Sequence, residues 1–197
     1  MVKCDQNNLI TCVREGKVVS FPTDTVPALA VLPGRSHLIF TLKDRPQNKP
    51  LILMGASSED LWQYVTGTTA ELEIWQQVAK NYWPGQLTLV LQTSRKLPAA
   101  INPTDPTSIG LRVPDCQIAL EILAATGPLA TTSANLSGEA PLETMTAIET
   151  TFPDVITLDF PQAGEKIGNG QPSTVAKWTE NGWTILRQGN IQLVTDK

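Results

Sequence analysis

Residues 109–135 read IGLRVPDCQIALEILAATGPLATTSAN, and this stretch predicts how the chain folds. Residues 109–113 and 129–132 are runs of aliphatic and β-branched side chains, which are typical of strands. Between them, residues 116–126 carry apolar side chains at helical spacing, and Asp115 stands where the N-cap of that helix belongs. The stretch therefore reads as a strand, a helix and a second strand.

The same alternation of strand and helix patterns continues in both directions from this unit. Because strands and helices are interleaved, we expect an α/β or α+β fold in which helices cover one sheet. The glycine-rich residues 161–172 are expected to form a loop, either over a cleft or inert on the surface. Further helices are predicted at residues 9–16, 36–43, 59–66 and 69–82, and further strands at residues 18–21, 28–32, 51–53, 87–92, 155–158, 173–178 and 183–186.

The whole chain has the composition of a globular protein. It holds 197 residues, of which 41% are hydrophobic and 17% are charged, and its formal net charge is −4. This length predicts a single domain over residues 1–197, because domains usually hold about 100–200 residues. No apolar run approaches the roughly 18 residues of a membrane span, and the N-terminus shows no signal-peptide pattern. Cys4, Cys12 and Cys116 form no Cys-x-x-Cys pair and are expected to be reduced thiols in a cytoplasmic protein.

The single histidine, His37, narrows the chemistry. It excludes metal sites built on paired histidines and leaves any Ser–His–Asp or Cys–His system dependent on this one residue. His37 lies in the predicted helix over residues 36–43, where a surface or capping role is the simpler interpretation. We therefore expect a function that does not use imidazole chemistry.

Polar side chains stand in or at the ends of three predicted strands. Residues 22–25, Pro-Thr-Asp-Thr, follow the first, Arg112 interrupts an apolar second strand, and residues 131–135, Thr-Thr-Ser-Ala-Asn, end the third. Each has a plain structural interpretation as a turn, an arginine on a solvated face or a helix cap. Together, hydroxyls, an amide and a cationic fork at strand ends indicate a pocket for a small zwitterion or a phosphate.

Residues 43–50, Lys-Asp-Arg-Pro-Gln-Asn-Lys-Pro, form the densest cationic segment. Its prolines prevent a helix from continuing through it. An extended cationic loop can hold a polyphosphate, although a solvated basic loop fits the residues equally well. The sequence has neither a Walker-type glycine loop nor a complete dinucleotide fingerprint, so a nucleotide would be held by side chains.

Several motifs follow one another in a defined order along the chain, from about Val18 to Ile191. They are Phe-Pro-Thr-Asp-Thr-Val (21–26), Lys-Asp-Arg-Pro (43–46), Lys-Pro-Leu (49–51), Trp-Pro-Gly-Gln-Leu-Thr-Leu-Val (83–90), Ile-Gly-Leu-Arg-Val-Pro-Asp (109–115), Thr-Ser-Ala-Asn-Leu-Ser-Gly (132–138), Pro-Ser-Thr-Val (172–175) and Leu-Arg-Gln-Gly (186–189). In this order they resemble the YrdC-like family of L-threonylcarbamoyladenylate synthases.

The resemblance implies an open, twisted, mixed sheet flanked by helices around a large, positively lined cavity. It implies that ATP, L-threonine and bicarbonate or CO2 are converted to threonylcarbamoyl-AMP and pyrophosphate, a nucleotidyltransferase reaction in which Mg2+ accompanies ATP at ligands that the sequence does not assign. The product would pass to a tRNA-modifying transferase, which attaches the threonylcarbamoyl group to an adenosine beside the anticodon. A monomer or weak dimer without membrane contact is expected, and contact with tRNA or double-stranded RNA is left open.

The resemblance also implies roles for individual side chains. L-threonine would be bound by Thr23, Arg112, Thr131 and Ser173. Arg112 would take its carboxylate through two parallel hydrogen bonds, and cations would neutralise the triphosphate as pyrophosphate leaves. No protein nucleophile is required, because the carbamate of threonine would itself attack the α-phosphorus. ATP would be bound by Lys43, Arg45, Lys49, Ser108, Ser133, Asn135, Pro141 and Arg187, and the catalytic group would be Lys43, Arg45, Ser133 and Asn135.

One segment departs from the family pattern. After Pro-Thr-Asp-Thr-Val the family usually continues Tyr-Gly-Leu-Gly, whereas residues 27–30 here read Pro-Ala-Leu-Ala. The loss of two glycines is expected to stiffen the pocket wall and to remove positive-φ freedom. Two alternative functions follow: a paralogue that binds nucleotide, RNA or the ribosome as a regulatory module, or an enzyme for another carbamoyl acceptor. The net charge of −4 weighs against non-specific binding of nucleic acid.

Overall fold

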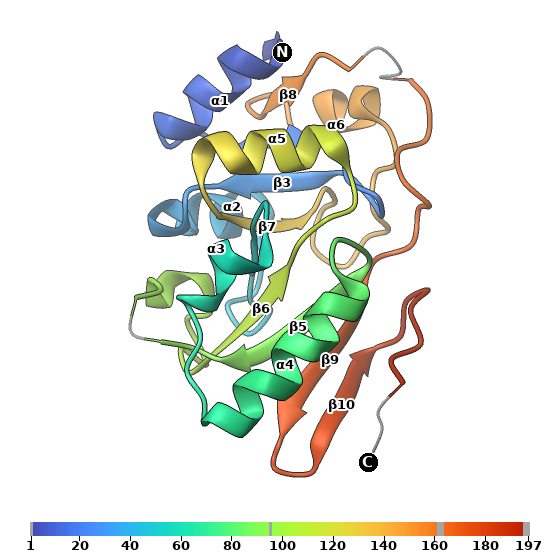
Figure 1. The fold of residues 1–197 in the computed structure, drawn as a ribbon. Coiled ribbons are helices and arrows are strands. Elements are labelled where there is room, and N and C mark those ends of the chain that lie inside the picture. Colours follow the sequence, from blue (N-terminus) through green and yellow to red (C-terminus); the bar gives the residue numbers. More distant parts are fainter. Residues whose placement is uncertain (1, 95, 161–163, 195–197) are drawn as a thin grey trace.

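The computed structural model describes residues 2–94, 96–160 and 164–194, which form a mixed α/β fold (Figure 1). The helices are α1 (Gln6–Arg14), α2 (His37–Leu42), α3 (Ser58–Trp62), α4 (Thr69–Tyr82), α5 (Gln117–Thr126) and α6 (Met145–Thr151), with short 3-10 helices η1 (Pro33–Arg35) and η2 (Ala99–Ile101). The strands are β1 (Val2–Cys4), β2 (Val19–Phe21), β3 (Ala28–Val31), β4 (Ile52–Met54), β5 (Leu87–Gln92), β6 (Ser108–Arg112), β7 (Leu129–Ser133), β8 (Ile156–Leu158), β9 (Thr174–Thr179) and β10 (Gly182–Arg187).

The strands form one ten-stranded sheet in the order β1-β8-β2-β3-β7-β4-β6-β5-β9-β10. The sheet is mixed: β2 and β3 pair antiparallel, whereas β4 pairs with β6, and β5 with β9, in parallel. Near its centre β7 lies between β3 and β4, so segments far apart in the sequence meet there. The prediction of a twisted mixed sheet flanked by helices is confirmed.

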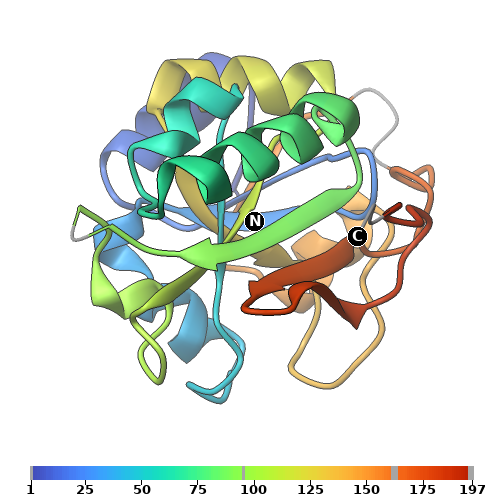
Figure 2. The ribbon, with the colours of Figure 1, turned by 60° about the horizontal axis from the view of Figure 1, so that its bottom comes forward.

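Side chains of the central strands alternate between the two faces of the sheet. On β5, Leu87, Leu89 and Leu91 are buried together in the apolar core, whereas Thr88 and Val90 point to the opposite face. Figure 2 shows α4 and α5, with α1 and α3, over one face of the sheet. The alternation therefore gives the sheet one apolar face for helix packing and one face that can carry polar groups.

Helix ends follow local capping chemistry, with one correction. Thr68 and Glu71 form a reciprocal capping box at the start of α4. The predicted N-cap of α5 at Asp115 is wrong: the N-cap is Cys116, whose side chain makes no capping hydrogen bond, because the helix begins one residue later than expected. Gly127, with φ of 78°, ends α5.

Besides the short 3-10 helices η1 and η2, the sequence pattern does not predict β1 and α6. Strand β1 is only three residues long and pairs in parallel with β8. Helix α6 is rich in threonine, which has low helix propensity. The hydroxyls of Thr150 and Thr151 bond back to carbonyls four residues earlier, and the helix is held by the burial of Met145 and Ile148. Tertiary packing thus overrides the local preference.

The predicted helix over residues 59–66 is too long, because α3 ends at Trp62. Beyond it, the amides of Tyr64 and Val65 donate to carbonyls three residues earlier, which makes turns rather than an α-helix. Val65 then forms an isolated antiparallel bridge with Thr93, which directly follows β5. The pattern of apolar residues there reflects a turn packed on the core.

Other expectations concern the cysteines, the histidine and membrane contact. Cys4, Cys12 and Cys116 all carry free thiols, and His37 is exposed at the start of α2. Within residues 2–94, 96–160 and 164–194, none of the helices has the length and apolar character needed to cross a bilayer.

The predicted glycine-rich loop is described from residue 164 onward, and residues 161–163 lie outside the described residues. Its backbone is held against the turn that follows β2: Asn169 N donates to Asp24 O at 3.3 Å, and Gly170 N donates to Thr25 O at 2.9 Å. Gly168 has φ of 65°, and a side chain there would collide with the backbone oxygen of Thr25. This part of the loop therefore packs on a polar turn of the sheet.

Candidate functional site

A cavity of about 550 Å³ opens on the sheet face that carries Thr88 and Val90. Strands β3 to β7, together with β9 and β10, contribute to its lining. The floor includes Gly110, which leaves it flat between neighbouring strands. The charged lining residues within the described chain are Arg45, Lys49, Asp105, Arg112, Lys177 and Arg187. Because cations outnumber the one carboxylate, this set favours anionic ligands.

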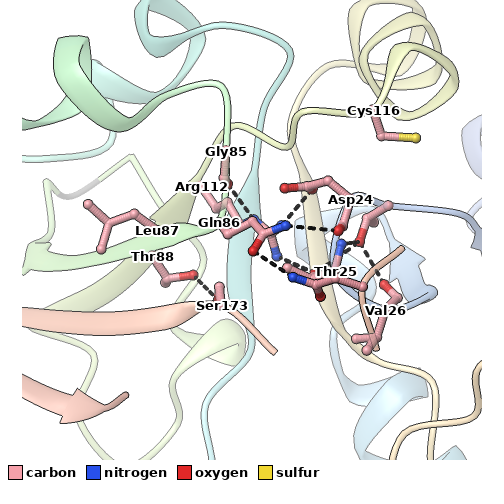
Figure 3. A network of polar contacts seen from close by, with 12 residues as sticks. Asp24, Thr25, Val26, Gly85, Gln86, Leu87, Thr88, Arg112, Cys116 and Ser173 are labelled. Atoms are coloured by element: carbon pink, nitrogen blue, oxygen red, sulfur yellow. Dashed lines mark hydrogen bonds and ion pairs between the residues drawn. The ribbon is translucent and has the colours of Figure 1, made fainter. Parts of the chain in front are cut away.

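Arg112 lies at one end of the cavity and is held by protein groups (Figure 3). Its Nε donates to Gly85 O at 3.0 Å, its Nη1 to Thr25 Oγ1 at 2.9 Å, and its Nη2 to Asp24 Oδ1 at 2.6 Å. The residue is only 4% exposed, so an arginine on a solvated face is the wrong interpretation. A buried guanidinium fixed on three sides is suited to orient a planar anion such as a carboxylate.

Hydroxyl groups surround this end of the cavity. Thr23 Oγ1 donates to Val26 O at 2.7 Å, and Ser173 Oγ lies 2.8 Å from Thr88 Oγ1 (Figure 3). Thr131 Oγ1 is buried and has no hydrogen-bond partner among the described residues. An unpaired buried hydroxyl is costly, so a ligand that bonds to Thr131 would be favoured.

Lys43 is buried beneath the turn that follows β7, with only 1% of its surface exposed. Its Nζ donates to Ser133 O at 2.6 Å and to Asn135 Oδ1 at 3.2 Å. Burial, together with the nearby positive charges of Arg45 and Lys49, lowers the pKa of the Lys43 ammonium to about 7. The solvated-loop interpretation is therefore wrong for Lys43.

Two further predicted cations, Arg45 and Arg187, are fixed by backbone carbonyls. Arg45 donates from Nε to Lys49 O at 2.7 Å and from Nη2 to Pro50 O at 3.0 Å, which ties the cationic loop to itself. Arg187 donates from Nε to Ser173 O at 3.0 Å. Burial lowers the pKa of both arginines, yet an arginine stays charged at neutral pH.

Most of the predicted site residues meet at this one cavity. The members that line it are Thr23, Arg45, Lys49, Ser108, Arg112, Thr131, Ser133, Asn135, Ser173 and Arg187. Lys43 and Pro141 are not lining residues: Lys43 lies under the Ser133–Asn135 turn, and Pro141 is half-buried outside the lining.

Sequence reasoning misses two charged lining residues, Asp105 and Lys177. Asp105 accepts from Ser108 Oγ at 2.6 Å, and this bond with those from Thr107 lowers the pKa of its carboxyl group. The backbone of Lys177 pairs with β5 and β10, and its side chain makes no hydrogen bond or ion pair with the described residues. The alternation Ser173, Val175, Lys177 along β9 would have placed Lys177 on the cavity face once Ser173 was placed there.

The segment at residues 27–30, which departs from the family pattern, lies partly in an ordinary strand. Pro27 and Ala28 line the cavity, and Ala28 to Ala30 lie in β3, paired with β2 and β7. Among the described residues Asp44 is the non-glycine residue with positive φ, so these alanines have ordinary strand conformation. Glycine's conformational freedom is therefore not required at these positions.

The lining does not resemble a resident metal site. Among the described residues there is no group of three or more His, Cys, Asp or Glu side chains that could hold an ion. The single lining carboxylate, Asp105, already accepts hydrogen bonds from Thr107 and Ser108. A divalent cation at this cavity would thus depend on ligands that a substrate supplies, such as phosphate oxygens.

Fold and cavity together describe a mixed α/β protein whose cavity has more cationic than acidic side chains in its lining. The family model Sua5_yciO_yrdC, described as telomere recombination, matches residues 11–189. The chain belongs to this Sua5/YciO/YrdC family.

Two curated relatives are named threonylcarbamoyl-AMP synthase. The protein from Pyrococcus abyssi is 35% identical over 185 residues, which cover 92% of this chain and 53% of that protein. The protein from Vibrio campbellii is 32% identical over 187 residues, covering 92% of this chain and 97% of that protein. The chain thus spans about half of the archaeal relative but nearly all of the bacterial one.

Solved structures share the fold. Sua5 from P. abyssi in complex with L-threonine matches with a TM-score of 0.81 and 31% identity, over 95% of this chain and 56% of that one. E. coli YciO matches with a TM-score of 0.80 and 24% identity, over 96% of this chain and 94% of that one, and supports the fold alone.

Proposed function

We propose that this protein is a threonylcarbamoyl-AMP synthase, which makes threonylcarbamoyl-AMP and pyrophosphate from ATP, L-threonine and bicarbonate or CO2. The observation that carries the proposal is the buried Arg112 fork beside a hydroxyl-lined, cation-rich cavity, in a chain whose P. abyssi relative has been solved with L-threonine. The Vibrio relative of the same name is matched along nearly its whole length.

In this proposal the threonine end of the cavity is built on Arg112. Its guanidinium takes the substrate carboxylate, and the hydroxyls of Thr23, Thr131 and Ser173 surround the amine and the substrate hydroxyl. The unpartnered Thr131 hydroxyl supports this role, because a bound polar substrate would satisfy it. Threonine would thereby be held with its amine directed along the cavity.

The nucleotide would occupy the rest of the cavity. Arg45, Lys49 and Arg187 would neutralise the triphosphate, with Ser108, Ser133 and Asn135 supplying polar contacts. Lys43 would act from beneath, by holding the Ser133–Asn135 turn and by adding charge when it is protonated. Mg2+ would arrive on the phosphate oxygens of ATP as part of the substrate.

The chemistry needs alignment and charge more than a protein nucleophile. The neutral amine of threonine adds to the carbon of CO2 and loses a proton to solvent, which leaves a carbamate. A carbamate oxygen then forms a bond to the α-phosphorus as the bond to the pyrophosphate oxygen breaks. The lining cations stabilise the charge that develops on the leaving pyrophosphate.

Burial of the cations weighs against the RNA-binding alternative. Lys43 and Arg112 are 1% and 4% exposed, so neither can lie against a nucleic-acid backbone on the surface. Arg112 is suited to a small anion that enters the cavity, and Lys43 would act on such an anion only from beneath the Ser133–Asn135 turn. The product would then pass to a tRNA-modifying transferase.

The test of this function is pyrophosphate release from ATP and Mg2+ by the purified protein, with threonine and bicarbonate omitted in turn. Release that requires both is the expected result. Release that is unaffected by omission of threonine would contradict the proposal, and release with another amine instead of threonine would assign a different acceptor.

A further inference from the structure

Asp24 lies next to the cavity wall without being part of its lining. Its Oδ1 pairs with Nη2 of Arg112 at 2.6 Å, and the two side chains are 9% and 5% exposed (Figure 3). Within the described residues this is the ion pair that Arg112 makes. Asp24 Oδ2 is buried and accepts no hydrogen bond there, so Arg112 compensates the carboxylate's charge.

The hydrogen bonds of Arg112 to the protein leave some of its N–H groups without a partner among the described residues. A guanidinium carries five N–H groups, one on Nε and two on each Nη. Gly85 O, Thr25 Oγ1 and Asp24 Oδ1 each take one, from Nε, Nη1 and Nη2 respectively. One N–H therefore remains on each Nη and is available to a ligand such as a carboxylate.

The groups that hold Arg112 are themselves fixed. Gln86 Nε2 donates to Asp24 O at 3.0 Å (Figure 3). Asn169 N and Gly170 N donate to Asp24 O and Thr25 O. The turn that carries Asp24 is thus tied both to the segment before β5 and to the glycine-rich loop. Rotation of the guanidinium would require these partners to separate.

We infer that Asp24 is a positioning residue, which turns the two free N–H groups of Arg112 toward the cavity and so selects ligands that carry a carboxylate. The inference rests on the proposed function, in which L-threonine binds at Arg112. Asp24 contacts no substrate in this scheme, because it is not part of the lining. Its effect on binding passes through the orientation of Arg112.

The test compares L-threonine with L-threoninol, in which a hydroxymethyl group replaces the carboxylate. Calorimetry gives the Kd of each ligand for the wild type and for Asp24→Asn, which keeps the shape and removes the charge. We expect the Kd of L-threonine to rise by about tenfold or more, because the charge-assisted hydrogen bonds between Arg112 and its carboxylate are lost. The Kd of L-threoninol should change little, because this ligand has no carboxylate. Their Kd ratio would fall accordingly.

A merely structural role would weaken both ligands alike and leave that ratio unchanged, and this result would overturn the inference. Tighter binding of L-threonine would also overturn it, because the negative charge of Asp24 would then only weaken the attraction of Arg112 for the substrate carboxylate. If Asp24→Asn does not fold, Asp24→Ser provides the second variant, because it also removes the charge that pairs with Nη2 of Arg112. The same fall in the ratio is expected, and an unchanged ratio contradicts the inference.

Glu149→Gln is the matched control. Glu149 is a carboxylate of similar burial, 12% exposed, which pairs with Lys3 away from the cavity. Its Kd ratio should equal that of the wild type. Failure of the proposed function gives a different result from failure of the inference. If the wild type itself does not prefer L-threonine to L-threoninol, the protein has no carboxylate site at Arg112, and this result does not depend on Asp24.

Discussion

Nζ of Lys43 lies 2.6 Å from the backbone oxygen of Ser133, which joins the end of α2 to the end of β7. This bond places a buried amine under the turn that lines the proposed phosphate end of the cavity. No acidic side chain lies in its set of hydrogen-bond partners, which are Thr132, Ser133 and Asn135. The charge of Lys43 is therefore sensitive to any anion that enters.

This arrangement predicts that ATP binding takes up protons. Burial lowers the pKa of Lys43 to about 7 in the free protein, and a bound triphosphate favours the charged amine. The Kd of ATP should therefore rise as pH increases from about 7 to about 9. Calorimetry in buffers of different ionisation enthalpy measures both the Kd and the proton uptake. Lys43→Met should bind ATP more weakly and without this pH dependence, and a wild-type Kd that is flat over this range would contradict the account.

The same lowered pKa predicts the sign of a stability change. The unfolded chain holds the Lys43 proton up to a higher pH than the folded chain does, so the unfolded state binds more protons between about pH 7 and pH 10. The contribution of Lys43 to the free energy of unfolding therefore rises with pH in this window. Denaturant titrations should show a free energy of unfolding that rises more steeply with pH in the wild type than in Lys43→Met.

The ion pair between Arg112 and Asp24 predicts that the two side chains are energetically coupled, and a double-mutant cycle measures this coupling. Arg112→Ala leaves a carboxylate that is 9% exposed without its partner, which should cost about 3–5 kcal/mol of unfolding free energy. Removing both charges in the Arg112→Ala, Asp24→Ala double variant should cost less than the sum of the single changes. Urea denaturation measures all four proteins. Additive losses would show that the two side chains do not stabilise one another.

Gly168 predicts a link between the glycine-rich loop and Arg112. Gly168→Ala adds a methyl group that collides with Thr25 O, and its φ of 65° is unfavourable for alanine by about 1–2 kcal/mol. Gly182→Ala is the matched control, because it has φ of 92° and open space around the new methyl group. Both should lower the melting temperature, but only Gly168→Ala should also weaken L-threonine binding. Equal L-threonine affinity in both variants would argue against the link.

The close packing around Gly110 predicts that the cavity floor has no room for a larger side chain at this position. A Cβ there would lie 2.8 Å from Ile52 Cγ2 and 3.2 Å from Thr88 Cγ2, so Gly110→Ala forces the floor to shift. Overpacking of this kind typically costs about 1–3 kcal/mol. The Kd values of ATP and L-threonine should both rise, as measured by calorimetry. Gly34→Ala, which meets no atom within 4 Å, should leave both Kd values unchanged.

The spacing of apolar residues along the sequence predicts the sheet and most of the helices, because a strand or helix that buries one face repeats its apolar residues at a fixed interval. The polar residues at the predicted strand ends, such as Arg112 and Thr131, are also predicted to share one pocket. These patterns do not reveal Asp24 as the partner of Arg112, since 88 residues separate the two and only the strand order brings them together. Lys177 is missed although it alternates with Ser173 and Val175, a spacing that puts all three on the face that the pairing of β5 with β9 places at the cavity. Helix α6 is missed because its stability comes from burial of Met145 and Ile148.

The most direct test of the central claim is mass spectrometry of the nucleotide product formed from ATP, Mg2+, L-threonine and 13C-bicarbonate. The account predicts threonylcarbamoyl-AMP that carries one 13C atom, formed by the wild type and lost in Arg45→Ala. A protein that binds ATP and L-threonine but forms no labelled adenylate under these conditions would contradict it.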